Sequence, residues 1–162
     1  MRKNIQIVNV RSASDMNRAV LDNIGEATIA VLCAAVADFW PNVYVEYQIK
    51  KGKEDNLTLL LKRTSDILAG IGARQHKPYL VGFAAESEEL NLNAVQKLQK
   101  KHCDMLCAND ITRPGAGFAG DTNQLTLYFK DGKCKTLDMM PKTILANRVF
   151  DEIIRCLDTQ NS

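Results

Sequence analysis

The sequence predicts an α/β fold in which a mainly parallel β-sheet carries an antiparallel hairpin at one edge. Short, nearly uninterrupted apolar runs alternate along the chain with stretches of helical periodicity, which is the order of the βα units that build parallel sheets. Near the C-terminal end, Asp131-Gly132 separates two more strand-like runs, and this dipeptide is a strong hairpin turn signal. We see no linker or repeat and expect one domain over residues 1–162.

The first half of the chain contains three predicted strands and two predicted helices. The strands are Ile5–Val10, Thr28–Val36 and Leu57–Lys62. Hydroxyl side chains stand where each helix would begin, namely Ser12 or Ser14 for the first and Thr64 or Ser65 for the second. Because Thr28–Val36 is almost entirely apolar or small, we expect it to be covered on both faces.

The second half repeats the pattern and then adds the hairpin. The predicted strands are Tyr79–Ala84, Met105–Ala108, Gln124–Phe129 and Lys133–Leu137. The predicted helices run from Ser87 to about His102 and from Pro141 to Leu157. Helices on both faces of such a sheet give a three-layer, Rossmann-like architecture. That architecture usually begins with a strand and a Gly-rich turn into a helix, so we expect that the domain is truncated and that its N-terminal βα unit is missing.

Composition excludes several classes of partner. The formal net charge of +2 is too small to indicate a nucleic-acid partner, and no apolar run approaches the length of a membrane span. The N-terminus has no signal-peptide core. The five cysteines form no paired CxxC pattern, and only two histidines accompany them, so the sequence indicates no zinc site and favours reduced thiols in the cytoplasm. The sequence gives no prediction of which residues would bind a metal ion.

Polar residues follow three of the predicted strands. Asp38 follows Thr28–Val36, Glu86 follows Tyr79–Ala84, and Asn109-Asp110 follow Met105–Ala108. Ligands of open α/β sheets bind at the carboxyl ends of strands, so these residues are candidates for one common cleft. The alternative, that they only cap turns or helices, is equally compatible with the pattern.

Basic residues and glycines offer weaker signals. Lys97 and Lys101 lie one helical turn apart and could hold successive phosphates, although such a pair is more often a solvated helix face. The basic segment Lys50–Lys53 could likewise close over a polyphosphate or remain exposed. Gly115–Gly120 matches GxGxxG, but a strand follows it and not a helix, so it does not support a nicotinamide site.

Several of these segments together resemble the phosphopantothenate–cysteine ligase family. The resemblance covers the chain from Ile5 to about Ile154. It rests on motifs that follow one another in the family's order: Ala34–Asp38, Ile49–Lys51, Asp66–Leu68, Val81–Glu86, Lys97–Lys101, Ala108–Asp110, Gly117-Phe118 and Asp121–Asn123.

The resemblance implies a CTP-dependent reaction of coenzyme A synthesis. The carboxylate of 4′-phosphopantothenate would attack the α-phosphate of CTP, and the amine of cysteine would then displace CMP, with Mg²⁺ or another divalent cation assisting. It further implies a homodimer and a flavin-dependent decarboxylase domain or chain as a partner. The implied nucleotide-binding residues are Ala35, Ala37, Asp38, Phe83, Lys97, Lys101, Ala108 and Asn109, with the segment from Lys50 to Asn56 as a cover.

The sequence departs from the family in its expected N-terminal unit and at one catalytic position. The family's Lys-Ile-Lys-Lys reads Gln48-Ile49-Lys50-Lys51 here. A neutral amide cannot supply positive charge to a developing oxyanion, and losing one such donor costs about 100- to 1,000-fold in rate. Lys50 could substitute, because residues two apart on an extended chain share a side. Two hypotheses therefore stay open: an active ligase, or a catalytically degenerate nucleotide-binding or regulatory subunit.

Overall fold

The computed structural model describes residues 4–43, 58–86, 90–110 and 120–160. The chain forms two compact units. The first contains Met1–Asn23 and Ala35–Ile67, and the second contains Ile24–Ala34 and Leu68–Ser162. Each unit is described by itself.

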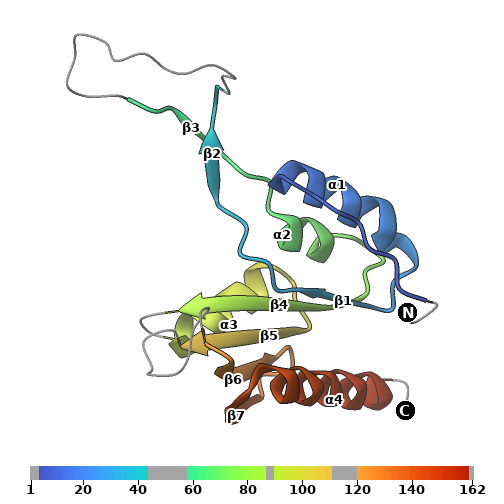
Figure 1. Ribbon diagram of the computed structural model, residues 1–162. Coiled ribbons are helices and arrows are strands. Elements are labelled where there is room, and N and C mark those ends of the chain that lie inside the picture. The colour runs from blue at the N-terminus through green and yellow to red at the C-terminus, as the bar shows by residue number, and fades with distance from the viewer. Residues whose placement is uncertain (1–3, 44–57, 87–89, 111–119, 161–162) are drawn as a thin grey trace. The chain divides into compact units, whose positions relative to one another are not determined.

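The second unit is built on a five-stranded mixed sheet (Figure 1). In spatial order its strands are β1 (Ile29–Leu32), β4 (Tyr79–Glu86), β5 (Met105–Asp110), β6 (Thr122–Phe129) and β7 (Cys134–Pro141). The pairs β1–β4 and β4–β5 are parallel, whereas β5–β6 and β6–β7 are antiparallel. This confirms the predicted α/β fold with an antiparallel hairpin at one edge.

Helices cover both faces of this sheet, which gives the predicted three layers. On one face, α4 (Lys142–Gln160) buries Leu145, Val149 and Ile153 against strand residues that include Val81 and Met105. On the other face, α3 (Leu90–Lys100) contacts β4, β5 and β6 and buries Ala94 and Leu98. Figure 1 shows α3 and α4 on opposite sides of the sheet.

The β6–β7 hairpin forms where Asp131-Gly132 predicted it, and its loop consists of the three residues that the predicted strands left between them. The Gly132 amide donates to the Phe129 carbonyl at 3.0 Å, and the Phe129 amide donates to the Lys133 carbonyl at 2.9 Å. Only Gly132 in this turn has a positive φ, of 85°. The loop is therefore a three-residue turn that ends in a left-handed glycine.

The C-terminal end of α3 closes with a left-handed residue and meets α2 (Ile67–Gly72). His102 has a φ of 51°. The Cys103 amide donates to the Leu98 carbonyl at 3.0 Å, and the His102 amide donates to the Gln99 carbonyl at 3.1 Å, the two hydrogen bonds of a Schellman motif. A Cβ placed on Gly72 would lie 1.9 Å from the Lys101 carbonyl oxygen, so only glycine allows this close approach.

The first unit contains α1 (Ala13–Asn23) and a two-stranded antiparallel ribbon of β2 (Phe39–Pro41) and β3 (Leu61–Arg63). Of the two proposed N-caps, Ser12 holds the position: its Oγ accepts from the Asp15 amide at 3.1 Å. The Asp15 carboxylate accepts from the Ser12 amide at 3.2 Å, which completes a capping box. In the ribbon, the Lys62 ammonium lies 4.1 Å from the centre of the Trp40 ring.

The structure corrects several predicted boundaries. Ile5–Val10 forms no strand, and Ile7 remains 79% exposed, because an alternating apolar run needs a neighbouring strand and none of the described residues supplies one. The strand predicted over Thr28–Val36 is limited to Ile29–Leu32, and Val31 is exposed. Asp66, and neither Thr64 nor Ser65, immediately precedes α2. Pro141 ends β7 and does not begin the last helix.

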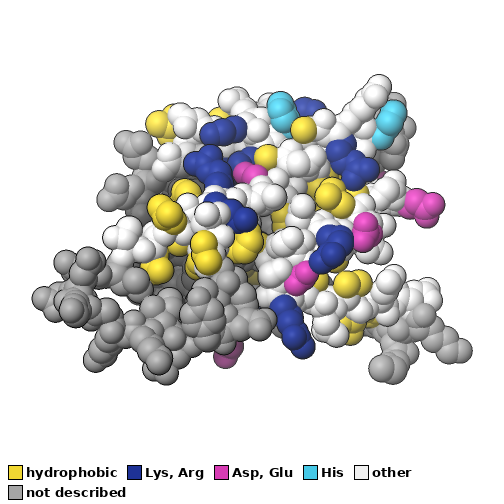
Figure 2. Space-filling view, turned by 90° about the horizontal axis from the view of Figure 1, so that it is seen from above, with side chains coloured by type: hydrophobic (Ala, Val, Ile, Leu, Met, Phe, Trp, Pro, Cys, Tyr) yellow, Lys and Arg dark blue, Asp and Glu magenta, His cyan; other side chains and the backbone are white. Residues whose placement is uncertain are grey.

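The surface matches the balanced composition. On the face drawn in Figure 2, Lys and Arg side chains lie among acidic and hydrophobic ones and form no continuous patch. Within the described part of the chain, every helix is too short or too polar to span a bilayer.

Candidate functional site

The carboxyl ends of β4 and β5 lie side by side, because the two strands are parallel and paired to their last residues. The register places Phe83 beside Cys107, Ala84 beside Ala108, and Ala85 beside Asn109. Successive side chains of a strand point to opposite faces, so Asn109 shares a face with Cys107 and Phe83, whereas Ala108 lies on the face that α3 covers. The structure thus brings together three of the predicted site residues, Phe83, Ala108 and Asn109.

Asn109 carries an unsatisfied polar atom in this edge. The residue is only 7% exposed, and its side-chain Oδ1 has no hydrogen-bond partner among the residues that the structure describes. An unpaired buried acceptor costs about 1–3 kcal/mol, and buried polar atoms in native proteins are nearly always paired. The Asn109 carboxamide is therefore suited to accept a hydrogen bond from an N–H or O–H group of a ligand.

The surroundings of Asn109 are apolar and small. Phe83 packs against the main hydrophobic cluster, and Cys107 is fully buried within it. Burial raises the pKa of the Cys107 thiol to about 12, which marks this part of the sheet as a poor solvent for charge. A hydrogen bond made beside such a wall is stronger than one made in water. Ala84 and Ala108 add little side-chain bulk on the opposite face.

Lys97 lies on α3 and Lys101 directly follows its last residue, and neither lies beside Asn109. α3 begins near the end of β4 and finishes near the start of β5, where the Lys101 carbonyl approaches Gly72. Asn109 lies five residues beyond Asp104, about 16 Å along an extended strand. Lys97 lies one helical turn nearer, about 6 Å. The i,i+4 spacing correctly predicted a shared helix face, and the roles of Lys97 and Lys101 stay predictions.

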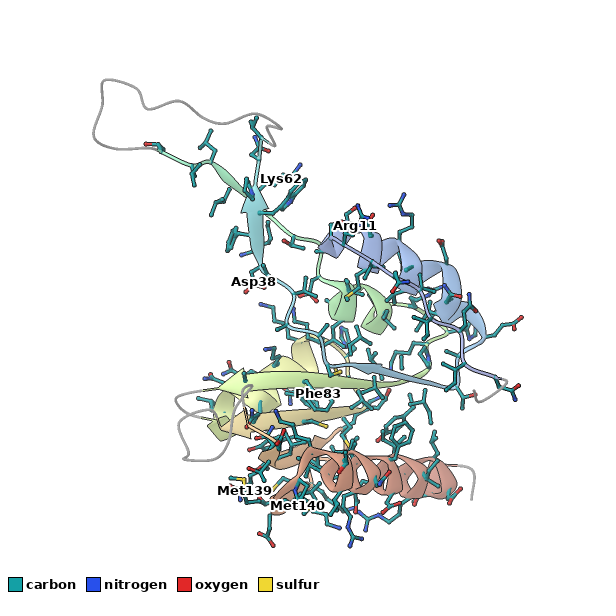
Figure 3. The ribbon with its side chains drawn as sticks, in the orientation of Figure 1. Arg11, Asp38, Lys62, Phe83, Met139 and Met140 are labelled. Carbon is teal, nitrogen blue, oxygen red and sulfur yellow. The ribbon has the colours of Figure 1, made fainter. Side chains whose placement is uncertain are left out.

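The remaining predicted site residues lie in the first unit or outside the described residues. Ala35, Ala37 and Asp38 precede β2 in the first unit and are exposed. The Asp38 carbonyl accepts from the Thr64 amide at 2.8 Å, which extends the pairing at the end of the ribbon where β2 begins and β3 ends. Asp38 is labelled in Figure 3. Gln48, Lys50 and the predicted cover up to Asn56 lie outside the described residues.

The described residues offer no ready-made metal cage. No group of three or more His, Cys, Asp or Glu side chains in this part of the chain could hold an ion. Mg²⁺ bound with a nucleotide does not need such a cage, because substrate phosphates and water supply most of its ligands.

The sheet is mainly parallel, helices cover both of its faces, and an acceptor without a partner among the described residues lies at the carboxyl ends of its strands. These features define the class of this protein. It is a Rossmann-like α/β protein, a class that binds its ligands at this edge. Residues 1–157 match the model of the DNA/pantothenate metabolism flavoprotein C-terminal domain, and the chain belongs to this family.

Curated relatives share the sequence over most of this chain. It is 40% identical over 148 residues to the coenzyme A biosynthesis bifunctional protein CoaBC of Bacillus subtilis, covering 91% of this chain and 36% of that protein. It is 38% identical over 160 residues to CoaBC of Escherichia coli strain K12, covering 97% and 39%. The chain therefore spans less than two fifths of the length of these relatives.

Solved structures confirm the fold. The crystal structure of the C-terminal domain of CoaBC matches with a TM-score of 0.75 and 32% identity, covering 94% of this chain and 66% of that one. The DNA/pantothenate metabolism flavoprotein from Streptococcus pneumoniae matches with a TM-score of 0.73 over 96% of this chain and 73% of that one. At 20% identity, the second match is a likeness of fold.

Proposed function

We propose that this chain is the nucleotide-binding part of a CTP-dependent phosphopantothenate–cysteine ligase in coenzyme A biosynthesis. The observation that carries the proposal is the buried Oδ1 of Asn109, which has no hydrogen-bond partner among the described residues. It lies at the carboxyl end of β5, the edge where this fold class binds ligands. The exocyclic amine of cytosine and the ribose hydroxyls are donors that such an acceptor can bind. Membership in the family of the CoaBC C-terminal domain supports the reaction class.

The proposed reaction has two balanced steps. An oxygen of the 4′-phosphopantothenate carboxylate attacks the α-phosphorus of CTP, so that an acyl-cytidylate forms and pyrophosphate leaves. The cysteine amine then attacks the acyl carbon, an amide forms, and CMP leaves together with the amine proton. Negative charge develops on phosphate oxygens in both steps, so cations would stabilise both transition states.

The residues would divide this work by position. Asn109 and Asp38 would contact the cytidine, with Ala35, Ala37, Phe83 and Ala108 beside it. Lys97 and Lys101 would hold the triphosphate, and Lys50 would serve the reacting carboxyl group where Gln48 cannot. A divalent cation would enter with the nucleotide and share its phosphates. We further propose that the chain acts as a homodimer beside a decarboxylase domain or chain, since its relatives are bifunctional proteins.

Calorimetric titration with CTP and Mg²⁺ tests the binding step. We expect CTP to bind and ATP to bind more weakly, because Asn109 and its neighbours would read the base. Lys97→Gln should lower CTP affinity about tenfold, whereas Lys100→Gln is the matched control on an exposed position of the same helix. Absence of CTP binding at millimolar nucleotide would refute the proposal, and equal affinities of the two variants would remove Lys97 from the site.

The residue at position 48 favours a second candidate, a catalytically degenerate nucleotide-binding or regulatory subunit. Release of pyrophosphate and of CMP should be measured separately, with phosphopantothenate and cysteine present, for the natural chain and for Gln48→Lys. Turnover by the natural chain would exclude the second candidate. CTP binding without turnover, restored by Gln48→Lys, would establish it. Pyrophosphate release without CMP release would show that only the second step depends on position 48.

A further inference from the structure

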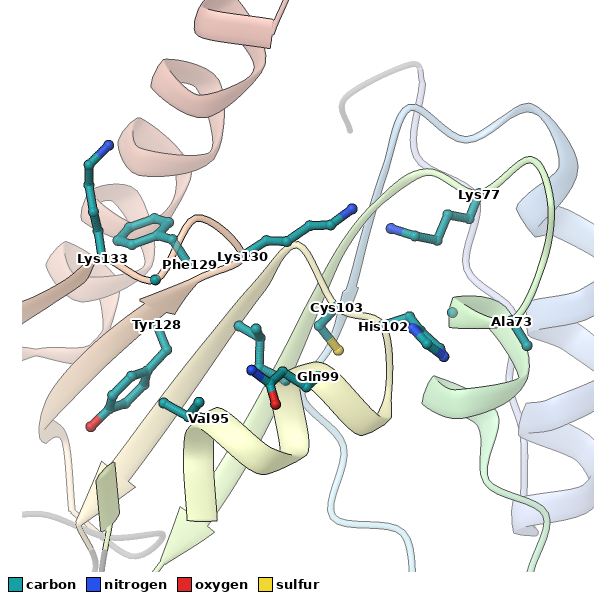
Figure 4. A pocket seen from close by; sticks show the side chains of 13 residues that line it. Ala73, Lys77, Val95, Gln99, His102, Cys103, Tyr128, Phe129, Lys130 and Lys133 are labelled. Carbon is teal, nitrogen blue, oxygen red and sulfur yellow. The ribbon is translucent and has the colours of Figure 1, made fainter. Parts of the chain in front are cut away.

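The second unit contains a cavity that the proposed ligase reaction does not use. Its volume is about 620 Å³, within the range of small-molecule sites. It lies between α3, the end of α2 and the β6–β7 turn, and its lining residues all belong to the second unit. Figure 4 shows the side chains that surround it.

The cavity lies at the opposite end of the sheet from Asn109. Its wall includes His102 and Cys103, which lie just before Asp104 and the start of β5, and Lys77, which lies two residues before the start of β4. Asn109 lies near the other end of β5, about 16 Å away along the strand. A ligand in the cavity would therefore not touch the proposed cytidine contact.

The inner wall of the cavity is apolar. Leu98, Cys103 and Tyr128 line it and are each at most 5% exposed. Val95 extends this wall toward solvent from α3, whereas the Phe129 side chain packs on the other face of the sheet, against the main hydrophobic cluster. An aliphatic or aromatic group placed here would be shielded from water on one side. Burial of its apolar surface would contribute about 25 cal/mol of binding free energy for each Å² buried.

The rim of the cavity is cationic. Three lysines line it, Lys77, Lys130 and Lys133, of which Lys133 forms an ion pair with the Asp131 carboxylate at 2.7 Å. The buried Asp104 lies behind the rim, where its carboxylate accepts from the Lys77 ammonium and from the Leu80 amide and lies 3.9 Å from the Lys130 Nζ. Figure 4 shows the Lys77 and Lys130 side chains extending toward one another.

Asp104 fixes Lys77 and attracts the exposed Lys130 without using all of their hydrogen-bonding capacity. Each ammonium group has three donors, so the ion pair with Asp104 leaves donors of Lys77 and Lys130 for a further acceptor. The main-chain hydrogen bond from the Lys130 amide to the Asp104 carbonyl, at 3.1 Å, holds the end of β6 in place as well. Anchored cations above an apolar wall match a molecule that has an anionic head and an apolar body.

We infer that this cavity is a second ligand site, specific for small amphipathic anions in which a phosphate or carboxylate is attached to an aliphatic chain. The head would lie between Lys77 and Lys130, and the chain would lie along Val95, Leu98 and Tyr128. Its lining residues include none of those proposed to contact the nucleotide.

Amide chemical-shift titrations test the site with three probes: hexyl phosphate, inorganic phosphate and 1-hexanol. Hexyl phosphate should shift the amides of Val95, Gln99, His102 and Lys130 and bind at least about tenfold more tightly than either of the other probes, because only it uses both the rim and the wall. The Asn109 amide should not shift, and saturating CTP should not displace hexyl phosphate.

Two variants separate charge from shape. Lys130→Gln combined with Lys133→Gln should weaken hexyl phosphate about tenfold; both side chains are largely exposed, at 72% and 81%, so the fold should persist. Val95→Trp should block the cavity for hexyl phosphate and 1-hexanol alike. Lys100→Gln, on α3 but outside the lining, is the control and should bind as the natural chain does.

Several results would overturn the inference. Equal affinities for hexyl phosphate and inorganic phosphate would show that the lysines bind phosphate without the cavity. Shifts centred on Asn109, or competition with CTP, would assign the binding to the proposed nucleotide site. Unchanged affinity in the lysine double variant, with the amide spectrum of the folded domain retained, would show that Lys130 and Lys133 do not bind the anionic head. None of these results depends on ligase activity.

Discussion

At the scale of single residues, Asn109 lowers the stability of the fold but offers a hydrogen-bond acceptor to a ligand. Its Oδ1 is buried without a partner among the described residues, which costs folding free energy that an apolar side chain of similar size would not. A donor supplied by a ligand would offset this cost.

Replacement of Asn109 by leucine should separate the two effects. We expect Asn109→Leu to raise the free energy of unfolding by about 1 kcal/mol, because the unsatisfied acceptor is removed, and to lower CTP affinity at least about tenfold. Urea denaturation and calorimetric titration measure the two quantities. Asn147→Leu, at an exposed position of α4, should change neither one. A less stable variant with undiminished CTP affinity would show that Asn109 is a structural residue only.

The cysteines should differ in reactivity according to their burial. Burial raises the pKa of Cys107 to about 12, so this thiol stays protonated far above neutral pH, whereas the reactive species is the thiolate. Cys134 is exposed. Brief labelling with N-ethylmaleimide at about pH 8, followed by peptide mass spectrometry, should therefore modify Cys134 and spare Cys107. Labelling after unfolding in urea is the control and should modify both. Equal labelling of the folded protein would contradict the buried position of β5.

Sequence reasoning placed the ends of two strands. A polar residue after an apolar run predicted where β5 stops, and the resemblance to the family implied Phe83, Ala108 and Asn109 as nucleotide contacts. The parallel pairing of β4 and β5 brings these three residues together, and their roles stay predictions. The distance from Lys101 to Asn109 was not predictable, since helical spacing gives a face but no position along the sheet. The cavity residues were missed because the fold assembles them from separate segments of the chain.

At the scale of elements, the glycines of α2 show how one helix is positioned. A Cβ on Gly72 would collide with the Lys101 main chain, whereas a Cβ on Gly70 would meet nothing within 4 Å. The junction of α2 with the end of α3 therefore requires glycine at position 72, whereas position 70 has room for a larger side chain. Since His102 and Cys103 continue from this junction into β5, it also shapes the wall of the cavity.

Two alanine substitutions should give effects of opposite sign. Gly72→Ala should lower the free energy of unfolding by about 3 kcal/mol, because main-chain atoms must move to admit the methyl group. Gly70→Ala should raise it by about 0.5–1 kcal/mol, because alanine loses less conformational entropy in a helix. Urea denaturation of both variants, followed by circular dichroism, provides the measurement. Similar destabilisation in the two variants would mean that α2 is not packed as described.

Elements were predictable where local chemistry and long-range packing agree. The β6–β7 hairpin, α3 and α4 formed close to their expected positions, since turn residues and an apolar stripe specify them together. Ile5–Val10 failed because its alternation indicated a strand whereas pairing needs a partner that local pattern does not reveal. The loop of the hairpin has the three residues that the predicted strand ends left, and its glycine takes the left-handed conformation.

At the scale of the whole molecule, the two units differ in how much core they contain. The second unit buries Leu80, Val81, Leu106 and Leu127 completely or nearly so. In the ribbon of the first unit, Phe39, Trp40 and Leu61 are each more than 40% exposed. A two-stranded ribbon is marginally stable by itself in water, so its stability has to come from outside its own hydrogen bonds. The family-implied homodimer is one such source and stays a prediction.

Amide hydrogen exchange should reveal this difference and test the dimer. In dilute protein we expect the amides of β4 and β5 to exchange about 1,000-fold or more slowly than the hydrogen-bonded amides of Asn42 and Thr64 in the ribbon, because local opening of the ribbon exposes little apolar surface. The comparison is internal, since all of these amides are hydrogen-bonded in the folded chain.

Repeating the measurement at higher protein concentration separates two causes of protection. Protection of the ribbon that grows with concentration would mean that a second copy covers it, because only a bimolecular contact depends on concentration. Protection that is equal to that of β5 at every concentration would contradict the exposed positions of Phe39 and Leu61.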